Sequence, residues 1–405
     1  MDPDVSHLDL DLGGSGVGEV LALFRRHPSL SRSDVGSRAG LSRGTVNLRL
    51  EALLRAGLLV PSGEQASARG RPAGRFAFNA AGGVLLVADV GATGMGTAVC
   101  DLGGRILAER SAVSDVTDGP EPVLTVVAEA FIELLIETGH HPDRVRGIGV
   151  AVPGPVDITA GQVVSPPIMT GWDRYDIPGW FAAHYDCPVM VDKDVNAMAF
   201  GEQRTHHPAV ANLLMLKIGT GVGAGIITNG GIYRGADGAA GDIGHSHVPH
   251  PAGTTEPVCR CGNTGCLEAY AGGWALVRDL RGAGHNITGV GQAINLVRSG
   301  EPTAVRLSRR SGVVLGGAIS DAVNLLNPRV VVVGGQLARA EEHLIAGIRE
   351  AVYRRSLPLA TRHLQIVTSQ LDRRAGLVGL ALLLADRIFD PTRVDQLIKS
   401  RQQVA

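Results

Sequence analysis

The stretch that decides the fold is GVLLVADVGATGMGTAVCDLGG, residues 83–104. The apolar run Val84–Ala88 predicts a buried strand, and a second strand is predicted over Gly96–Cys100. Together they predict a β-hairpin whose loop has little side-chain bulk. Small residues in such a loop let the backbone approach a phosphate group, and an aspartate there can organise hydrated Mg²⁺. The candidate phosphate-loop residues are Asp89, Gly91 and Thr93.

A second hairpin of the same kind is predicted at residues 213–235, LLMLKIGTGVGAGIITNGGIYRG. One glycine-rich hairpin is often only structural. Two of them, each starting a β-β-β-α unit, predict an internally duplicated α/β fold with a cleft between the halves. A third glycine turn follows the buried-type strand 330–333, where it either approaches a nucleotide base or merely ends the strand. The candidates for nucleotide contact here are Gly219, Thr220, Gly221, Gly334 and Gly335.

The segment 16–80 predicts a winged helix-turn-helix domain. Helical patterns are expected at 16–27, 35–39 and 42–57, and strands are expected at 58–63 and 75–80 with a wing between them. Ser31, with Asp34 three residues later, gives a capping-box-like start to the second helix, and Gly40 and Gly57 are expected to end the second and third helices. Between Val20 and Ala80 there are ten Arg, no Lys and three acidic residues, which gives a local charge of +7.

This charge and motif favour DNA as a partner, with the third helix in the major groove. Arginine can read guanine edges and asparagine can read adenine edges, while a cationic wing suits phosphate or minor-groove contacts. A small helical bundle with solvated arginines is the simpler alternative, but capping, turn, charge and wing agree on DNA binding. The candidate DNA-binding residues are Ser42, Arg43, Thr45, Asn47 and Arg49 on the third helix, and Arg69 and Arg71 on the wing, where Arg75 also lies.

The composition narrows the remaining classes. A chain of 405 residues suggests two or three domains, and 44% hydrophobic residues with 55 Gly suit an α/β protein with many tight turns. A net charge of −1 argues against general binding of polyanions by the whole molecule. Residues 1–15 are expected to form a disordered tail. No apolar run approaches a membrane span and no signal peptide opens the chain, so we expect a cytoplasmic, nucleoid-associated protein.

A cysteine cluster predicts a structural zinc site. Three thiolates and one imidazole make a closed tetrahedral ligand set, and closed sites of this kind are usually structural. Chance or reactive thiols are the alternative reading. The expected ligands are His245, Cys259, Cys261 and Cys266. Cys100 and Cys187 lie in strand-like contexts, so we expect them in the core.

Together these motifs resemble the ROK (repressor, open reading frame, kinase) family, in its regulator subgroup. The resemblance covers nearly the whole chain. It rests on Gly70-Arg71-Pro72, the loop at 89–93, the segments 149–155 and 191–197, the loop at 219–225, the run 241–245, and the cysteine cluster through Glu268. It implies a two-lobed actin-like ATPase, or sugar kinase, fold. The small lobe would span 81–195, completed by about 376–390. The large lobe with the zinc site would span 196–375, and 391–405 would form a helix near the DNA-binding domain.

The resemblance also implies roles for residues in the cleft. Asp194 lies where the family's kinases have their catalytic base, which takes the proton from the attacking sugar hydroxyl. A structural carboxylate capping a helix over 195–202 is the alternative for this residue. The implied sugar-binding residues are Gly91, Pro153, Gly154, Lys193, Asp194, Asp242, His245 and Glu268. His245 would bind zinc through one ring nitrogen and face the sugar with the other.

Three positions depart from the kinase pattern. Lys193 stands where the kinases usually have Asn, Asp242 where they have Glu, and Gly94 where Lys is often seen. Lys193 is expected to change the hydroxyl pattern that fits, and an ion pair with Asp194 would lower the basicity of that carboxylate. Trp172 lies in a segment that resembles the lining of the sugar pocket, where it either stacks on a sugar or serves as a buried anchor.

The expected function is therefore a sugar-responsive transcriptional regulator of carbohydrate genes, most simply a repressor. Its partners would be operator DNA, a monosaccharide or sugar derivative, and further copies of the chain in a homodimer or homotetramer. The first alternative is an ATP-dependent sugar kinase that retains a DNA-binding domain, and only that activity would require ATP and Mg²⁺. The second is a regulator controlled by a protein partner. Apolar stripes over 313–326 and 377–388 are expected to be core or dimer surface.

Overall fold

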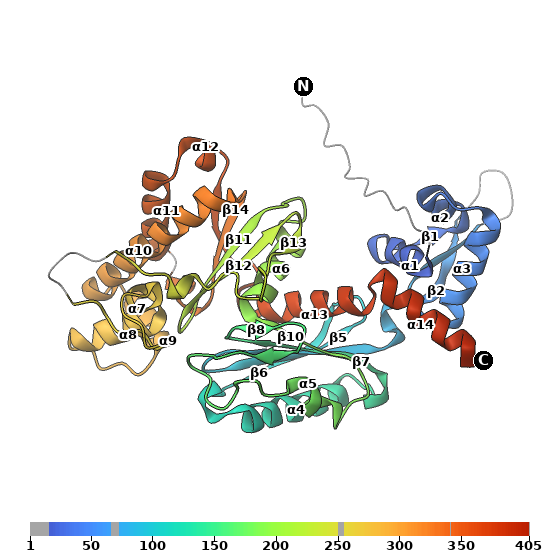
Figure 1. Cartoon of the computed structure of the whole chain (residues 1–405), viewed down its shortest axis with the longest axis horizontal. Coiled ribbons are helices and arrows are strands. Elements are labelled where there is room, and N and C mark those ends of the chain that lie inside the picture. The colour runs from blue at the N-terminus through green and yellow to red at the C-terminus, as the bar shows by residue number, and fades with distance from the viewer. Residues whose placement is uncertain (1–15, 66–72, 250–254, 341, 405) are drawn as a thin grey trace.

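The computed structural model of the chain describes residues 16–65, 73–249, 255–340 and 342–404. A small head with a three-stranded sheet lies at one end, next to two larger α/β lobes (Figure 1). The expected tail at 1–15 and the wing residues Arg69 and Arg71 lie outside the described residues. Among the described helices, none combines the length and apolar character needed to cross a bilayer.

The head is a winged helix-turn-helix, as predicted. It contains α1 (Val17–Arg26), α2 (Arg32–Ala39), α3 (Arg43–Arg55), β1 (Leu30–Ser31), β2 (Leu59–Gln65) and β3 (Ala73–Phe78), with sheet order β1-β3-β2. The helix α2 begins three residues before the predicted start because the capping box acts at Ser31. The Oγ of Ser31 accepts from the Asp34 amide at 3.2 Å, and the Ser31 amide donates to the Asp34 carboxylate at 2.8 Å. Gly40 ends α2 with φ +64°, in the left-handed region that favours glycine.

The first lobe is built on a five-stranded sheet with order β10-β7-β4-β5-β6. Its elements are β4 (Val84–Val90), β5 (Met95–Asp101), β6 (Ile106–Ala112), α4 (Pro120–Glu137), β7 (Val145–Val152), the small pair β8 (Val156–Asp157) and β9 (Gln162–Val163), α5 (Ile177–Ala182) and β10 (Val189–Lys193). Alternate residues of β4 enter different cores. Leu86 and Ala88 pack towards α4, while Leu85 and Val87 pack towards α13 (Ala375–Ile388). This strand is therefore buried on both faces, which explains its continuous apolar sequence.

The second lobe repeats the pattern with sheet order β13-β12-β11-β14-β15. Its elements are β11 (Leu213–Ile218), β12 (Val222–Thr228), β13 (Gly231–Ile232), α7 (Leu267–Ala271), α8 (Gly273–Gly282), α9 (Val290–Arg298), α10 (Pro302–Leu326), β14 (Val330–Gly334), α11 (Glu342–Arg355), α12 (Pro358–Thr361) and β15 (Gln365–Thr368). The two sheets match strand for strand, so the predicted duplication is confirmed. The helix α10 begins well before the predicted 313, because Glu301 caps it by accepting from the Ala304 amide at 2.6 Å and Pro302 suits its first turn.

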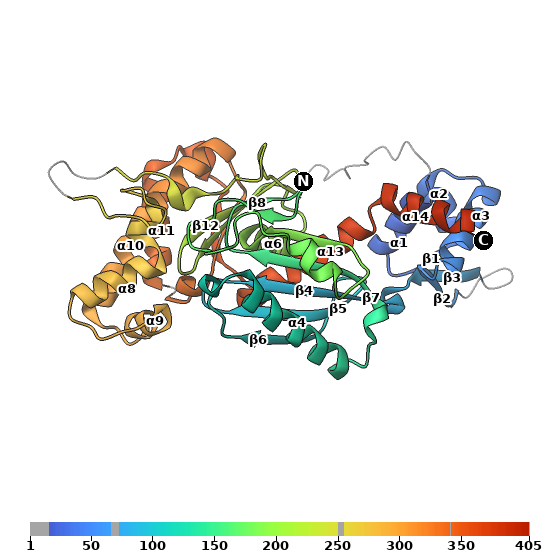
Figure 2. The ribbon, with the colours of Figure 1, turned by 60° about the horizontal axis from the view of Figure 1, so that its bottom comes forward.

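Two helices lie between the sheets, α6 (Asp194–His206) and α13 (Figure 2). They approach closely because each presents a glycine to the other. A Cβ atom at Gly201 would lie 2.7 Å from the Ala375 carbonyl oxygen, and one at Gly379 would lie 1.7 Å from the Ala197 carbonyl oxygen. Neither position accepts a side chain without moving a backbone. The two helices are therefore expected to move as one body.

The helix α14 (Pro391–Val404) follows α13 and packs on the head. Val394 and Ile398 belong to the same apolar cluster as Val20 and Leu21 of α1. The Asp395 carboxylate accepts a hydrogen bond from the Gly18 amide at 2.9 Å, which satisfies a donor at the start of α1. The head is thus completed by residues from the far end of the sequence.

Candidate functional site

The helix α3 offers a narrower exposed face than the sequence suggested. Arg43 is exposed at its N-terminal end, whereas Thr45, Asn47 and Arg49 are half-buried. Ser42 serves as the N-cap, because its Oγ accepts from the Thr45 amide at 3.3 Å. The Asn47 side-chain oxygen accepts from the Nε of Arg32 in α2 at 3.1 Å, so its amide group remains available as a donor.

Two further residues change the picture of the head. Leu48, which the sequence reasoning missed, is 70% exposed on α3 beside Asn47. Arg75, which was expected on the wing, binds the body of the head. Its Nε donates to the Ser29 hydroxyl at 2.8 Å, and its guanidinium lies 3.5 Å from the Asp34 carboxylate. Arg75 therefore fixes β3 against the start of α2.

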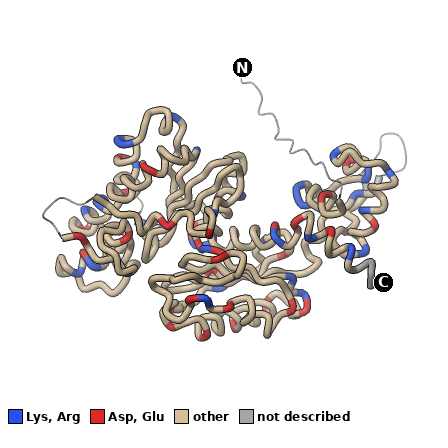
Figure 3. Tube along the Cα trace, viewed as in Figure 1, with Lys and Arg blue, Asp and Glu red and all other residues tan. Residues whose placement is uncertain are grey.

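The cleft residues come from the carboxyl ends of parallel strands. Asp89 lies near the end of β4, Pro153 follows β7, and Lys193 ends β10. These strands are neighbours, and Val152 pairs directly with Lys193. Ligand sites in open α/β sheets form at this edge. Charged residues of both signs gather where the two lobes meet (Figure 3).

Asp194, the expected base, is paired with a lysine that the sequence reasoning missed. Its Oδ2 accepts a hydrogen bond from the Nζ of Lys217, which lies near the end of β11 in the other lobe. Asp194 is the first residue of α6 and does not act as its N-cap; that position belongs to Lys193. The structure therefore brings Asp194 into the cleft, but as one half of an ion pair between the lobes.

Asp89 is the second carboxylate near this ammonium group. Burial raises the pKa of Asp89 to about 6; Lys217 opposes the rise and Asp194 adds to it. Burial alone would lower the pKa of Lys217, but the charges of Asp194 and Asp89 outweigh it and raise the pKa above its usual value. Lys217 is therefore a charged ammonium group that is hydrogen-bonded to Asp194 and acts on Asp89 through its charge.

Lys193 does not bind Asp194, so the ion pair that the sequence allowed between them does not form. Its ammonium donates to the Asp242 carboxylate at 2.5 Å and to the Ala240 carbonyl oxygen at 3.2 Å. The side chain of Lys193 is only 5% exposed. The two departures from the kinase pattern thus compensate each other, because the shorter carboxylate of Asp242 pairs with the added cation. A ligand here meets a neutralised pair instead of a free carboxylate.

A third ion pair lies directly behind Lys193. Asp192 accepts from Arg234 at 2.5 Å, and it also accepts from the Lys193 amide and the Asn196 side chain, each at 2.8 Å. Asp192 is fully buried. The pair was not predicted, and it fixes the junction between β10 and α6 from which both Lys193 and Asp194 project.

One signal in the sequence pointed to the unpredicted cation. The chain contains only three lysines, Lys193, Lys217 and Lys399, while arginine supplies its other basic side chains. Two of the three lie in the cleft. A lone lysine in the apolar strand before the second glycine loop is therefore a better candidate for a role in the site than for a solvated surface charge.

The predicted metal ligands come together as a closed cluster. One ligand atom from each of His245, Cys259, Cys261 and Cys266 lies within 4.8 Å of the others. The Sγ of Cys259 is 3.9 Å from the Nδ1 of His245, and the Sγ atoms of Cys261 and Cys266 are 3.8 Å apart. Three sulfurs and one imidazole nitrogen at these separations fit a tetrahedral zinc ion.

Glu268 connects the metal cluster to the cleft. One carboxylate oxygen accepts from the Val222 amide at 3.1 Å, and the other lies 3.8 Å from the Sγ of Cys259. A Cβ atom at Gly221 would lie only 2.1 Å from this carboxylate, so the second glycine loop closes over it. The loop, the expected sugar-binding glutamate and the cluster therefore form one unit.

Four of the eight expected nucleotide residues line two separate cavities. Thr93 and Thr220, from the two glycine loops, line a cavity of about 490 Å³ together with Arg260. Gly334 and Gly335 line a separate cavity of about 410 Å³.

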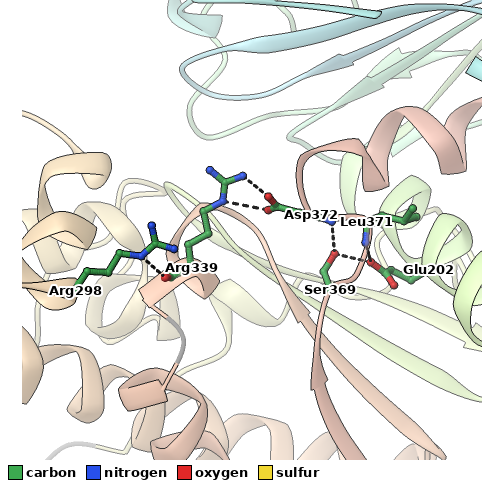
Figure 4. Close-up of polar contacts among 6 residues, drawn as sticks. All are labelled: Glu202, Arg298, Arg339, Ser369, Leu371 and Asp372. Atoms are coloured by element: carbon green, nitrogen blue, oxygen red, sulfur yellow. Dashed lines mark hydrogen bonds and ion pairs between the residues drawn. The ribbon is translucent and has the colours of Figure 1, made fainter. Parts of the chain in front are cut away.

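Polar contacts shape the second cavity. Arg339 pairs with Asp372 through two hydrogen bonds of 3.1 and 2.7 Å, and the Nε of Arg298 donates to the Arg339 carbonyl oxygen at 3.0 Å (Figure 4). Beside them, Ser369 donates to the buried Glu202 of α6 at 2.5 Å. The loop after β15 is thereby tied to the helix that carries Asp194.

Trp172 is a buried anchor. It has no exposed surface, and its Nε1 donates to the Val116 carbonyl oxygen at 3.0 Å. The alternative of stacking on a sugar is therefore excluded in this structure. Of the remaining expected sugar residues, Gly154 packs against the segment around Met169, where a Cβ atom would lie 3.1 Å from the methionine sulfur.

Comparisons with known proteins agree with this architecture. Residues 85–387 match the model of the ROK family, and residues 18–60 match a winged helix-turn-helix DNA-binding model. The xylose repressor of Bacillus subtilis is 25% identical over 92% of this chain and 95% of its own length. A glucokinase of Thermotoga maritima is 29% identical but covers 75% of this chain, with 98% of its own length aligned.

A solved structure gives the same result for the whole molecule. The crystal structure of a ROK family transcriptional regulator, described as a homologue of the E. coli MLC protein, superposes with a TM-score of 0.79 and 27% identity. It covers 95% of this chain and 98% of its own. The similarity therefore includes the head as well as both lobes.

Proposed function

The chain belongs to the ROK family, and from that premise we propose that it is a sugar-responsive, DNA-binding transcriptional repressor. The observation that carries the proposal is the winged helix-turn-helix fused to the sugar-kinase fold. The xylose repressor and the regulator structure align with the head and both lobes, whereas the glucokinase aligns with about three quarters of the chain. We propose that the genes it regulates are genes of carbohydrate metabolism.

The DNA-binding surface is the exposed face of α3. In a helix-turn-helix, the N-terminal half of the second helix contacts base edges in the major groove. Arg43 and the free amide of Asn47 supply hydrogen-bond donors there, and Leu48 supplies an apolar surface suited to a thymine methyl group. The two wing arginines, Arg69 and Arg71, are proposed to add phosphate or minor-groove contacts.

The effector site is the cleft between the lobes. A sugar there would meet the Lys193–Asp242 pair, the Lys217–Asp194 pair and Glu268, all of which present donors or acceptors suited to hydroxyl groups. His245, Cys259, Cys261 and Cys266 would hold a zinc ion that fixes the loop carrying Glu268. We propose a monosaccharide or a simple derivative as the effector.

The response is a population shift between two arrangements of the lobes. An effector that prefers one arrangement changes the position of α13 and α14, and with them the head. A differential affinity of roughly tenfold to hundredfold, about 1–3 kcal/mol, is enough to change operator occupancy strongly. Half-site spacing then requires at least two heads, so we propose a homodimer or homotetramer acting at the nucleoid in the cytoplasm.

The test combines DNA selection with a sugar panel. Duplexes that bind the zinc-loaded chain would be selected from a random library, and their affinity measured by fluorescence anisotropy with and without each sugar, including xylose and glucose. We expect one sugar to change operator affinity at least about tenfold and to raise the melting temperature at the same concentration. An operator affinity that no sugar changes, together with brisk release of ADP from ATP, would support the kinase alternative instead.

A further inference from the structure

The position of Lys217 gives the cleft a fixed cation. Its neighbours in the sheet are Gly223 on β12 and Gly334 on β14, neither of which has a side chain to fill the space beside it. The lysine chain runs beneath the second glycine loop, where a Cβ atom at Gly219 would lie 3.7 Å from its Cε. The ammonium group therefore lies beneath the second glycine loop, which would approach a phosphate.

Two carboxylates from the other lobe meet this ammonium group. Asp194 accepts a hydrogen bond from it, and Asp89 acts on it through its charge. The Oδ1 atom of Asp89 is buried and has no hydrogen-bond partner among the described residues. A buried carboxylate oxygen without a donor needs a cation nearby, and Lys217 is the cation that the chain supplies.

This arrangement does not fit a divalent metal ion. Mg²⁺ requires oxygen ligands in a near-octahedral shell with several retained waters, and phosphoryl transfer also requires a carboxylate free to accept a proton. Lys217 neutralises the charge of Asp194 and acts on Asp89 through its own charge, so an approaching Mg²⁺ would meet a positive charge and no free carboxylate pair. The side chain of Lys217 keeps 24% of its surface exposed, so the pair lies at the cleft and is not sealed in a core.

We propose that the ammonium group of Lys217 replaces the divalent cation of the cleft, so that it neutralises Asp194 and Asp89, excludes Mg²⁺ and leaves a sugar site that works without metal or phosphoryl transfer. This inference rests on the proposed function, because it explains how a kinase fold serves as a sensor. It concerns Mg²⁺ alone and leaves the zinc cluster in place.

The test is metal binding in a variant without the charge. Lys217→Met keeps a long unbranched side chain and removes the ammonium group. Mn²⁺, a paramagnetic substitute for Mg²⁺, would be titrated into zinc-loaded protein and followed by electron paramagnetic resonance. We expect the variant to bind one Mn²⁺ per chain at least about tenfold more tightly than the unmodified chain, since the opposing charge is gone. Adding Asp89→Asn to Lys217→Met should abolish this site.

A matched control removes a lysine elsewhere. Lys399 is exposed on α14, and Lys399→Met should leave Mn²⁺ binding as it is in the unmodified chain. Lys217→Gln provides a second neutral variant in case the methionine variant fails to fold. ATP turnover is not the readout, because Lys193 and Asp242 also depart from the kinase pattern.

Two results would overturn the inference. One is a site in the unmodified chain that binds Mn²⁺ as tightly as the variant does and is lost with Asp89→Asn. The other is a folded neutral variant that binds Mn²⁺ no better than the unmodified chain. Failure of the proposed function has a different signature, namely operator affinity that no sugar changes, and it leaves the Mn²⁺ measurement unaffected.

Discussion

At the residue scale, the charge in the cleft depends on which carboxylate each of its two lysines, Lys193 and Lys217, binds. Lys193, at the end of β10, binds Asp242 of the second lobe, while Lys217, near the end of β11, binds Asp194 at the start of α6. Both pairs are shielded from water, so removing one partner leaves a charge in a poorly solvated place and is costly. Each pair also adds a contact between the lobes, and that contact depends on how far the cleft is closed.

Asp89→Asn should change how stability depends on pH. The pKa of Asp89 is raised from 3.8 to about 6, so the folded chain binds this proton more tightly than the unfolded chain. Its favourable contribution is complete below the unfolded pKa and is lost as the pH rises through about 6. Relative to the unmodified chain, the variant should therefore gain stability between about pH 4 and 7, by at most about 3 kcal/mol. Urea unfolding over that range measures the difference, and a constant difference would contradict the assignment.

Sequence reasoning identified the residues of this site better than it identified which of them form ion pairs with one another. The glycine-loop pattern placed Asp89 in the cleft, and the resemblance to the ROK family placed Asp194 and Asp242 there. The choice between Asp194 and Asp242 as the partner of Lys193 depended on side-chain direction at a strand-to-helix junction. A pattern in the sequence does not encode that direction. The lone lysine in β11 became meaningful only when both sheets were placed.

At the element scale, the loop from η4, a short 3₁₀ turn at Ile243–His245, to α7 has few apolar residues and depends on its cysteines. Cys259 and Cys266 are buried, and the small cluster around them includes Ala269 and Trp274. Arg260 stacks over the Trp274 ring with its guanidinium carbon 5.1 Å from the ring centre, which extends the cluster towards the cavity that Thr93 and Thr220 line. Metal binding and cleft geometry are coupled through this loop.

Cys266→Ser should weaken both stability and effector binding. Loss of one thiolate lowers zinc affinity, and the loop that positions Glu268 then loses its main constraint. We expect less than one zinc per chain and a melting temperature lowered by about 10 °C. Sugar binding, measured by calorimetry, should weaken as well. Cys187→Ser is the control, because this half-buried cysteine lies outside the cluster and should leave zinc content unchanged.

The elements themselves were largely predictable. Hydrophobic periodicity and glycine punctuation gave the head and both hairpins, and the capping residues gave the start of α2 to within three residues. The long helix α10 was predicted too short, because its first turns contain few large apolar residues and begin at the cap that Glu301 provides.

At the scale of the whole molecule, one carboxylate joins the cleft helix to the head. Asp386 of α13 accepts from Arg204 of α6 at 3.1 Å and from Arg25 of α1 at 2.7 Å. Arg25 also lies over the Phe389 ring, 5.4 Å from its centre. Since α6 begins at Asp194, a shift at the cleft reaches Asp386 through a single helix.

Asp386→Asn should uncouple the effector from the operator. The variant keeps the shape of the side chain but loses two partly exposed ion pairs, each worth up to about 1 kcal/mol. We expect the ratio of operator affinities with and without sugar to fall by about threefold to tenfold, while sugar affinity itself changes little. Anisotropy and calorimetry give the two quantities separately.

Glu350→Gln is the matched control for this variant, because Glu350 pairs with Arg309 at 2.8 Å between α10 and α11, away from the head. Its coupling ratio should equal that of the unmodified chain. A full sugar response in Asp386→Asn would show that the signal reaches the head by another route.

The packing of α14 against α1 has a consequence for how the chain is made. During translation, residues 17–55 leave the ribosome long before Val394 and Ile398, so the hydrophobic centre of the head stays incomplete until residues 391–404 emerge. A chain released early by a premature stop codon would lack α14 and would bind its operator weakly. Only a chain in which both lobes have also been synthesised therefore has a complete head for binding DNA.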